Sequence, residues 1–589
     1  MNKRGQQRFR TVLSIFFLSC LITGCGGSAD YEKREDTETA TLIFDLENDG
    51  FYINELKNGT YFDTNEDGIA EKVNWTTQDT FLAMDVNGDG VINNAGELFG
   101  NQTYLLKDKK AEDSFQALAQ YDSNEDGVIN MSDEKFSDLL LWHDADGNGI
   151  SDNTELKALE EAGIRQINLS YSVNDEYYNE AKRGGMGTFV REDGTEGQLG
   201  EFWLCKIAYS TIDRTDIEIP EELRAYPDIE SIGKMHALQV ALAQDETGYL
   251  KSLVDTFAAS VDMAEKKLLV EEILHFMCHT ENIDSDSRGN DIDAKDLAVI
   301  ETMMGEDFYG ADGPNPNYQA VPMLQNIYSQ LVDGYYAQLA EQTSLKRFMA
   351  MLVPATNSQG NEYIDTQMFN SLVLSYLDTE EGKCALQEMA LYLKYVSSGN
   401  LGGYNEFIIF FAKESEEAIQ LIAEATNDII MVEGEGFSEG TLKDDCMVGN
   451  GEDNYISGRD GDDLLYGGDG EDTLNGLSGN DIFYGGPGDD FFSGSEGADV
   501  YHIGMEDGND IISNYDTTYT RVTDCIVFGE GISVEDIWIK RNGNDMQLIN
   551  RENGQITTVQ EHYTEADYRL EQVVFSDGTK CKVEDLAGE

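Results

Sequence analysis

The chain has 589 residues, a length that suggests roughly three to five domains. It contains 113 acidic and 40 basic residues, for a formal net charge of −73. This charge argues against a nucleic-acid-binding protein, because contact with a phosphate backbone needs a basic surface.

The first 24 residues have the pattern of a signal segment. Four basic residues between Lys3 and Arg10 precede an apolar run over residues 12–22, which is too short to span a bilayer as a mature helix. The run ends in LITGC, which resembles the lipoprotein box of bacteria and implies cleavage before Cys25 and lipidation of its thiol. An ordinary secretory signal with a coincidental cysteine is the alternative. The polar residues 25–40 predict a linker.

Six cysteines lie beyond Cys25, and none forms a C-x-x-C pair. Their spacing excludes a zinc ribbon. Disulfides are permitted outside the cytoplasm, but the six residues allow 15 connectivities and the sequence does not choose among them.

Residues 41–210 contain several short acidic loops. The clearest spans residues 144–155, reads DADGNGISDNTE and matches the 12-residue EF-hand pattern. Its predicted ligands are the side chains of Asp144, Asp146, Asn148, Asp152 and Glu155 and the carbonyl group of Ile150.

Further loops repeat parts of this pattern. In the second, the predicted ligands are Asp85, Asn87, Asp89, Val91, Asn93 and Glu97, the last one place late. In the third they are Asp122, Asn124, Asp126, Val128 and Asp133. A weaker fourth loop has Asp63, Asn65 and Asp67, with Glu71 as a possible closing acid, and a fifth begins at Asp45. Any one could be a plain Asx turn; together they favour an EF-hand-like calcium module over residues 41–210.

Residues 213–432 predict an all-α domain. Apolar residues recur there at spacings of three and four, which is typical of helices packed on one face. The predicted helical runs are 235–244, 250–279, 294–304, 323–340, 372–396 and 416–427.

Five nine-residue units follow one another from Gly458 to His502. They read GRDGDDLLY, GGDGEDTLN, GLSGNDIFY, GGPGDDFFS and GSEGADVYH. Each has glycine at its first and fourth positions, aspartate at its sixth and a large apolar residue at its eighth, which is the RTX pattern G-G-x-G-x-D-x-U-x. The units predict a parallel β-roll over residues 433–503, and five intact units disfavour the alternative of a flexible linker.

The repeat also predicts what each position does. Glycine permits a positive φ in the turn, and the recurring carboxylates would repel one another unless Ca²⁺ lay between them. The predicted calcium ligands are Asp463, Asp472, Asp481, Asp490 and Asp499 with the turn residues Gly461, Gly470, Gly479 and Gly488. The predicted core is the column of eighth residues, Leu465, Leu474, Phe483, Phe492 and Tyr501. Short alternating runs over residues 504–589 predict a small β cap.

The order of these motifs resembles that of large secreted RTX proteins. The matching segments are FLAMDVNGDGVIN, GELFG and LWHDADGNGIS in the acidic module and VFSDGT near the C-terminus. Some members of that family have a calcium-dependent module that cuts its own chain at an Asp-Pro bond. The aligned bond here is Ala40–Thr41, and no proline of this chain follows an aspartate, so such cleavage is not expected. The lipoprotein signal also departs from the family's usual one-step export.

No catalytic motif such as G-x-S-x-G or H-E-x-x-H is present, and we expect no enzyme activity. His275 and His279 could share a helix face and hold zinc, but core packing is the better interpretation because no third ligand is identifiable.

The sequence therefore predicts a multidomain α+β protein with an EF-hand-like calcium module, an all-α middle domain and a parallel β-roll with a C-terminal β cap. We expect an exported calcium-binding lipoprotein, anchored at the bacterial cell surface or secreted. Its expected partners are several Ca²⁺ ions, the membrane, and a protein or glycan at the surface, with a role in adhesion or display. The alternative is a calcium-dependent self-processing or transpeptidating protein.

Overall fold

The computed structural model describes residues 38–105, 109–289, 291–310, 313–356, 362–395, 403–434, 436–515, 523–564 and 570–586. The chain divides into two compact units. Among the described residues, one unit comprises 38–256 and 269–332, and the other comprises 257–268 and 333–586.

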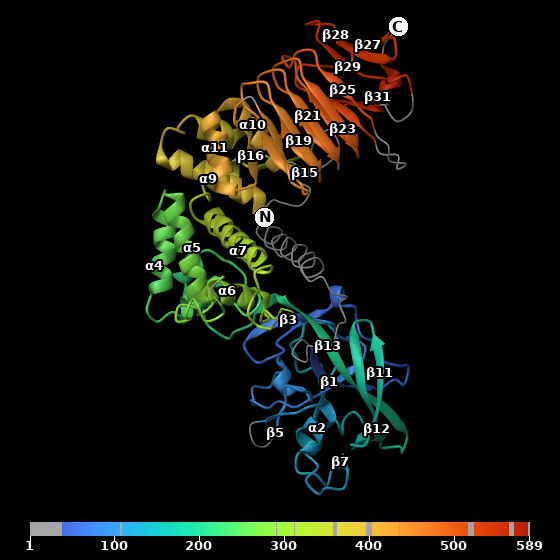
Figure 1. The fold of residues 1–589 in the computed structure, drawn as a ribbon. Coiled ribbons are helices and arrows are strands. Elements are labelled where there is room, and N and C mark those ends of the chain that lie inside the picture. Colours follow the sequence, from blue (N-terminus) through green and yellow to red (C-terminus); the bar gives the residue numbers. More distant parts are fainter. Residues whose placement is uncertain are drawn as a thin grey trace. The chain divides into compact units, whose positions relative to one another are not determined.

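The first unit begins with a β module, residues 38–213, built on one large antiparallel sheet (Figure 1). Its strand order is β7-β10-β12-β13-β1-β4-β8-β9, with β11, β3 and β2 attached at the side. The strands are β1 (Glu38–Asp45), β2 (Thr60–Phe62), β3 (Ile69–Val73), β4 (Thr80–Ala83), β7 (Val128–Asn130), β8 (Leu140–Trp142), β9 (Leu156–Ala158), β10 (Ile164–Asn168), β11 (Ser172–Tyr178), β12 (Ala181–Arg191) and β13 (Glu196–Asp213). A hairpin of β5 (Tyr104–Leu105) and β6 (Lys109–Lys110) and the short helix α2 (Ser114–Ala119) complete it.

Both faces of this sheet are buried. Successive residues of a strand point to opposite faces, and here Leu42 and Phe44 lie in one apolar cluster while Ile43 lies in another. The second cluster contains Trp75 and Trp142, both fully buried. The module therefore has a substantial core that involves no metal-binding side chain.

The EF-hand expectation is wrong for the fold around the loops. Among the described residues, none of the acidic loops lies between two helices: β2 and β3 flank the Asp63 loop, and β8 and β9 flank the Asp144 loop. The flanking apolar runs, such as Leu140–Trp142, are three or four residues long, which suits a strand but is too short to nucleate a stable helix. The resemblance to an EF-hand is confined to the loop sequences.

Residues 213–432 are largely helical, as expected. The helices are α3 (Leu238–Gln244), α4 (Tyr249–Ala259), α5 (Met263–Met277), α6 (Ala294–Met304), α7 (Val321–Gln342), α8 (Gln367–Leu374), α9 (Glu380–Tyr395), α10 (Gly403–Glu414) and α11 (Glu416–Thr426). The all-α expectation misses the hairpin of β14 (Val353–Thr356) and β15 (Glu362–Asp365). The predicted run 250–279 is broken where Asp262 accepts hydrogen bonds from the backbone of Ala264 and Glu265, as an N-cap does.

The second unit ends in a β-roll of two parallel sheets (Figure 1). One sheet contains β16 (Ile429–Met431), β18 (Cys446–Val448), β20 (Leu464–Tyr466), β22 (Ile482–Tyr484), β24 (Val500–Ile503), β26 (Cys525–Phe528) and β30 (Gln572–Phe575). The other contains β17 (Phe437–Glu439), β19 (Tyr455–Asp460), β21 (Thr473–Ser478), β23 (Phe491–Glu496), β25 (Ile511–Ser513) and β29 (Ile556–Val559). Antiparallel strands β27 (Ile537–Asn542), β28 (Asp545–Asn550) and β31 (Lys580–Lys582) finish the two sheets.

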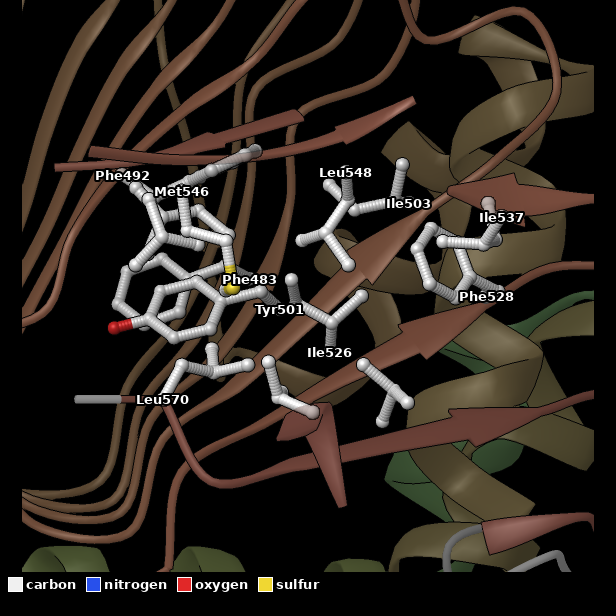
Figure 2. Close-up of a cluster of buried hydrophobic side chains, with 14 of the residues drawn as sticks. Phe483, Phe492, Tyr501, Ile503, Ile526, Phe528, Ile537, Met546, Leu548 and Leu570 are labelled. Carbon is white, nitrogen blue, oxygen red and sulfur yellow. The ribbon is translucent and has the colours of Figure 1, made fainter. Parts of the chain in front are cut away.

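The register shows that two nonapeptides make one turn of the roll. Leu464 pairs with Ile482, and Ile482 pairs with Val500, a spacing of 18 residues. The expected core is confirmed, since all five eighth-position side chains are at most 1% exposed. Figure 2 shows this column around Phe483 and Tyr501, whose stacked rings lie 5.1 Å apart. Parallel pairing continues past residue 503 through β25, β26, β29 and β30.

Candidate calcium-binding sites

The sixth-position aspartates of the repeats form two buried ladders along the roll. Asp463, Asp472, Asp481, Asp490 and Asp499 are at most 1% exposed. In each, Oδ1 accepts a hydrogen bond from the backbone N–H of the residue 18 positions earlier, at 2.7–3.0 Å. One carboxylate oxygen of each aspartate thus joins consecutive turns of the roll through a hydrogen bond.

The other oxygen of these carboxylates is not satisfied by the chain. Oδ2 of Asp463, Asp472, Asp481 and Asp490 is buried and has no hydrogen-bond partner among the described residues. Burial, aided by neighbouring carboxylates, raises the pKa of Asp463 and Asp481 to about 7, of Asp472 to about 6 and of Asp490 to about 8. Rows of buried oxygens without donors fit a hard cation with oxygen ligands, such as Ca²⁺.

The glycines of the repeat make room for this arrangement. A Cβ on Gly476, at the first position of its unit, would lie 2.0 Å from Oδ2 of Asp481. The fourth-position residues Gly461, Gly470, Gly479 and Gly488 have φ between +118° and +155°. A Cβ on Gly479 would lie 1.9 Å from the carbonyl oxygen of Gly461, one turn away. Both glycine positions are therefore required by the packing of the turns, as the pattern predicts.

Two further aspartates of the ladders were not predicted from the sequence. Asp510 accepts from the N–H of Asp490 at 3.1 Å and is 1% exposed. Its Oδ2 has no hydrogen-bond partner in the described part of the chain, and burial raises its pKa to about 8. Asp524 accepts from the N–H of Asp499 at 2.9 Å. Their spacings of 20 and 25 residues break the period of 18. The fragment GNDII around Asp510, which keeps the end of the repeat, is the signal that could have found it.

One ladder ends in hydrogen bonds that the chain itself supplies. Asn514 donates from Nδ2 to Oδ2 of Asp524 at 2.8 Å, and the Tyr501 hydroxyl donates to Oδ1 of Asn514 at 2.8 Å. This carboxylate therefore has donors for both oxygens, unlike those of Asp463 and Asp481 in the same ladder.

In the β module, two of the predicted loops gather three acids each. Ligand atoms of Asp85, Asp89 and Glu97 lie within 4.8 Å of one another. Glu97 is 3% exposed; its Oε2 accepts from the backbone of Asn93, and its Oε1 has no partner among the described residues. Burial and the charges of Asp89 and Asp85 raise the pKa of Glu97 to about 7. The acid that stands one place late in the sequence is thus brought to the loop by the turn at residues 95–97.

The second gathering consists of Asp144, Asp146 and Glu155, again within 4.8 Å. Asp144 is fully buried and accepts from the amide of Gly149 at 2.9 Å and from the indole of Trp75 at 2.7 Å. Trp142 donates its indole N–H to Glu155 at 3.3 Å. The loop acids are therefore held by the aromatic core beneath them.

Other predicted ligands of these two loops shape the turns. Asn87 and Asn148 donate from their amides to Asp89 and Asp146. The backbone N–H groups of Val91 and Ile150 bond to Asp89 and Asn148. Asp152 accepts at Oδ1 from Thr154, which lowers its pKa, so that oxygen is occupied within the loop.

The remaining three loops have the geometry of satisfied Asx turns. In the fifth loop, Asp45 accepts from the amides of Asp49 and Gly50. Asp63 accepts from the amides of Asn65, Glu66 and Gly68. The proposed closing acid Glu71 is paired with the ammonium group of Lys206 at 2.7 Å.

In the third loop, Asp122 accepts from the amides of Asp126 and Gly127, while Asp133 accepts from Ser123 and Asn130. Asn124 accepts from Asp126, and Val128 donates to Asp126. Within the part of the chain that is described, neither this loop nor the Asp63 loop brings three acids together. Their geometry favours the Asx-turn alternative.

Comparison with known proteins supports the repeats independently. A family profile described as the RTX calcium-binding nonapeptide repeat matches residues 439–474, 448–483 and 466–501, so the roll carries calcium-binding repeats of the RTX type. A profile described as the SPM domain matches residues 42–205, which is nearly the whole β module.

A longer relative aligns with most of the chain. The iron-regulated protein FrpA of Neisseria meningitidis serogroup C is 28% identical over 607 aligned positions, covering 93% of this chain and 52% of FrpA. The chain thus spans about half the length of this curated relative. The solution structure of the AlgE6R3 subunit of the Azotobacter vinelandii mannuronan C5-epimerase matches 27% of this chain and 86% of its own, at 22% identity and a TM-score of 0.15, too low to inform the fold.

Two expectations concern the membrane and the cysteines. The signal segment and Cys25 lie outside the described residues. Across the residues that are described, no helix is both long and apolar enough to cross a bilayer. No disulfide joins the six cysteines found there.

Proposed function

We propose that this chain is an exported, lipid-anchored calcium-binding protein whose β-roll orders on calcium and which acts in adhesion or display at the bacterial cell surface. The observation that carries the calcium-dependent folding is the row of buried Oδ2 atoms of Asp463, Asp472, Asp481 and Asp490, which have no donor among the described residues. Isolated buried carboxylates destabilise a fold, and ions placed along the ladders would remove that penalty.

In this proposal the residues of the chain hold the ladder in place and the ion supplies positive charge. The Oδ1 atoms fix each aspartate to the preceding turn, and the first-position glycines leave space beside Oδ2. Few apolar groups are available per turn, so the core alone offsets little of the chain entropy lost on folding. Binding and folding are then one event.

The proposed location follows from the affinity expected of such modules. Extracellular calcium modules bind at roughly 10⁻⁴ to 10⁻³ M, well above cytosolic calcium levels. The roll would stay unfolded during export and fold outside. The lipoprotein-like segment ending at Cys25 supports a membrane tether, and the acidic surface suits a protein or glycan partner rather than nucleic acid.

Hydrogen–deuterium exchange on the full chain tests the folding proposal. We expect residues 439–515 to gain protection when calcium is added to chelated protein, with no equal gain from magnesium. The paired strands β1 and β13 of the β module serve as an internal reference, because their pairing involves no ladder aspartate and no acid of the Asp85 or Asp144 loops. Full protection of the roll in chelator would contradict calcium-driven folding.

A self-processing or transpeptidating activity is the second candidate, favoured by the SPM-domain match that begins at residue 42. The geometry of the aligned bond opposes it. Ala40 and Thr41 are at most 1% exposed and lie inside β1, paired with Trp203 and Phe202 of β13. We expect full-length protein to remain intact on a denaturing gel after prolonged incubation with calcium; a fragment starting at Thr41 would restore this candidate.

A further inference from the structure

A wide cleft lies in the first unit, away from the acidic loops that resemble EF-hands. Its volume is 1340 Å³, and it is lined by residues of β1, β12 and β13 together with the segment that follows α6. Among the described residues, no acid of the Asp85 or Asp144 loop lines it. Pockets for one small ligand usually measure about 300–1,000 Å³, so this cleft has room for an extended ligand.

A bulge in β12 makes room on the lining of this cleft. The register between β12 and β13 shifts across Gly184 and Gly185. A Cβ on Gly184 would lie 2.3 Å from Oε2 of Glu201 and 3.0 Å from the indole nitrogen of Trp203. Glycine inside a strand often marks a place where a ligand approaches closely. Here it keeps open the space beside a carboxylate and an indole that lie next to each other.

These two side chains offer a hydrogen-bond acceptor and a donor. Glu201 is 4% exposed; its Oε1 accepts from the N–H of Ser114 at 2.7 Å and its Oε2 from the N–H of Gly185 at 3.2 Å. Each carboxylate oxygen has a further lone pair for a ligand hydroxyl. The indole N–H of Trp203 has no hydrogen-bond partner among the described residues. The carboxylate is therefore fixed in place, while the indole donor is available.

Two exposed tyrosines add to the aromatic lining. The ring of Tyr171 stacks on the buried ring of Phe115, with centroids 4.2 Å apart and an interplanar angle of 11°, and Tyr171 is 42% exposed. Tyr309 is 65% exposed. Together with Trp203, they give the cleft three aromatic side chains among polar groups. Aromatic faces pack against the C–H faces of sugar rings, while acceptors and donors beside them bond to the hydroxyl groups.

The charge of the cleft differs from that of the whole chain. Five acids and four lysines line it, so the cleft is nearly neutral, whereas the chain carries a formal net charge of −73. Three of the lysines, Lys110, Lys206 and Lys234, interact with neighbouring side chains. The cleft thus has no excess charge that would attract an ionic ligand, and it suits a neutral ligand rich in hydroxyl groups.

We propose that this cleft binds a neutral oligosaccharide. Sugar rings pack on Trp203, Tyr171 and Tyr309, and Glu201 accepts hydrogen bonds from their hydroxyl groups. The inference rests on the adhesion role proposed above and deepens it by naming the chemistry of the partner. The aspartate ladders of the roll take no part in it.

Saturation-transfer-difference NMR on the full-length chain, in saturating calcium, tests the proposal. The probes are maltohexaose, cellohexaose, mannohexaose and chitohexaose, and we expect transfer to the ring protons of at least one of them. Absence of transfer to all four would overturn the proposal. Transfer to a neutral glycine–serine hexapeptide that Trp203→Ala abolishes, without transfer to any sugar, would assign the cleft to a peptide partner and overturn it as well.

Variants locate the binding in the cleft. Trp203→Ala should raise the dissociation constant of the bound sugar by at least about tenfold, as expected when a central aromatic contact is truncated. The matched control is Trp538→Ala, a partly exposed tryptophan of the roll, which should leave binding unchanged. Equal binding by the parent chain and Trp203→Ala would overturn the site.

A second pair of variants uses residues whose exposure makes unfolding no explanation for lost binding. Tyr309→Ala should weaken binding by at least about threefold, whereas Tyr318→Ala, at a tyrosine that is 76% exposed and lies outside the cleft, should not. Equal effects of the two would overturn the site. A parent chain that binds no probe, while its roll still gains exchange protection with calcium, would overturn the cleft alone and leave calcium-driven folding standing.

Discussion

Two loops of the β module and the ladders of the β-roll differ in how the chain satisfies their acidic residues. In the Asp63 and Asp122 loops, backbone amides and a lysine satisfy the carboxylates. In the roll, Asp463, Asp472, Asp481 and Asp490 each receive one backbone donor, and their second oxygen is buried without a hydrogen-bond partner among the described residues. We infer that an acidic loop needs a bound ion only where the chain itself provides neither hydrogen-bond donors nor a cationic side chain for its carboxylates.

Substitution of Lys206 tests that comparison most directly, and we expect it to change stability more than any other variant considered. Its ammonium group and Glu71 form a pair whose side chains are 12% and 8% exposed, beside Asp63. Lys206→Met should destabilise the β module by about 3–5 kcal/mol, because it leaves Glu71 buried and uncompensated. Thermal unfolding measures the loss.

The informative control is Lys206→Met with Glu71→Gln, which removes both charges and should restore most of the stability. Added calcium should also recover part of the loss in the single variant, since the Asp63 loop would then lack its internal cation. If Lys206→Met proves as stable as the parent chain, the lysine does not replace an ion.

In the roll, Asp481→Asn should stabilise the fold in the absence of calcium and destabilise it in the presence of calcium. Without calcium we expect stabilisation by about 2–3 kcal/mol near pH 8, since the amide retains an oxygen acceptor and carries no buried charge. With saturating calcium we expect destabilisation, because a charged ligand is lost. Chemical denaturation in chelator and in calcium measures both values.

Asp462→Asn is the matched control, since Asp462 also accepts from a backbone amide one turn later but is exposed. It should have little effect in either condition. Destabilisation by Asp481→Asn in chelator would refute the idea that the ladder carries an unmet charge.

The repeats could be predicted from sequence because their period fixes nearly every contact. The eighth-position residues, the glycine turns and the aspartate positions all follow from a nine-residue spacing. Asp510 and Asp524 were not predicted as ladder members, because longer connections interrupt the nine-residue spacing there while the ladder continues in three dimensions.

Long-range pairing explains the other differences. Loop sequences alone suggested an EF-hand module, but the short strands around them join one sheet through distant partners: β3 pairs with β13, and β4 pairs with both β1 and β8. The pairing of Glu71 with Lys206, 135 residues away, likewise has no local signal. Glu97 was found because an acid one place late in a loop can still be brought round by a turn.

The pH dependence of stability should also differ between the two regions, and we expect this effect to be smaller. Burial raises the pKa of the ladder aspartates to about 6–8 in the folded roll, above the ordinary value of 3.8. The folded state therefore holds protons more tightly than the unfolded state, and without calcium the roll should gain stability as the pH falls from about 8 towards 4. With calcium the protons compete for the same oxygens, so the calcium concentration for half-folding should rise severalfold from pH 8 to pH 7.

The satisfied Asp122 loop of the β module should respond in the opposite direction. Hydrogen bonds hold the pKa of Asp133 below its usual range, so its contribution to stability is present above about pH 4 and is lost in more acidic solution. Exchange protection of the two regions, followed over the same pH series in chelator, measures both trends. Parallel loss of protection below pH 7 in the module and the roll would mean that the ladder carboxylates are not held apart from solvent, and the contrast between the two regions would fail.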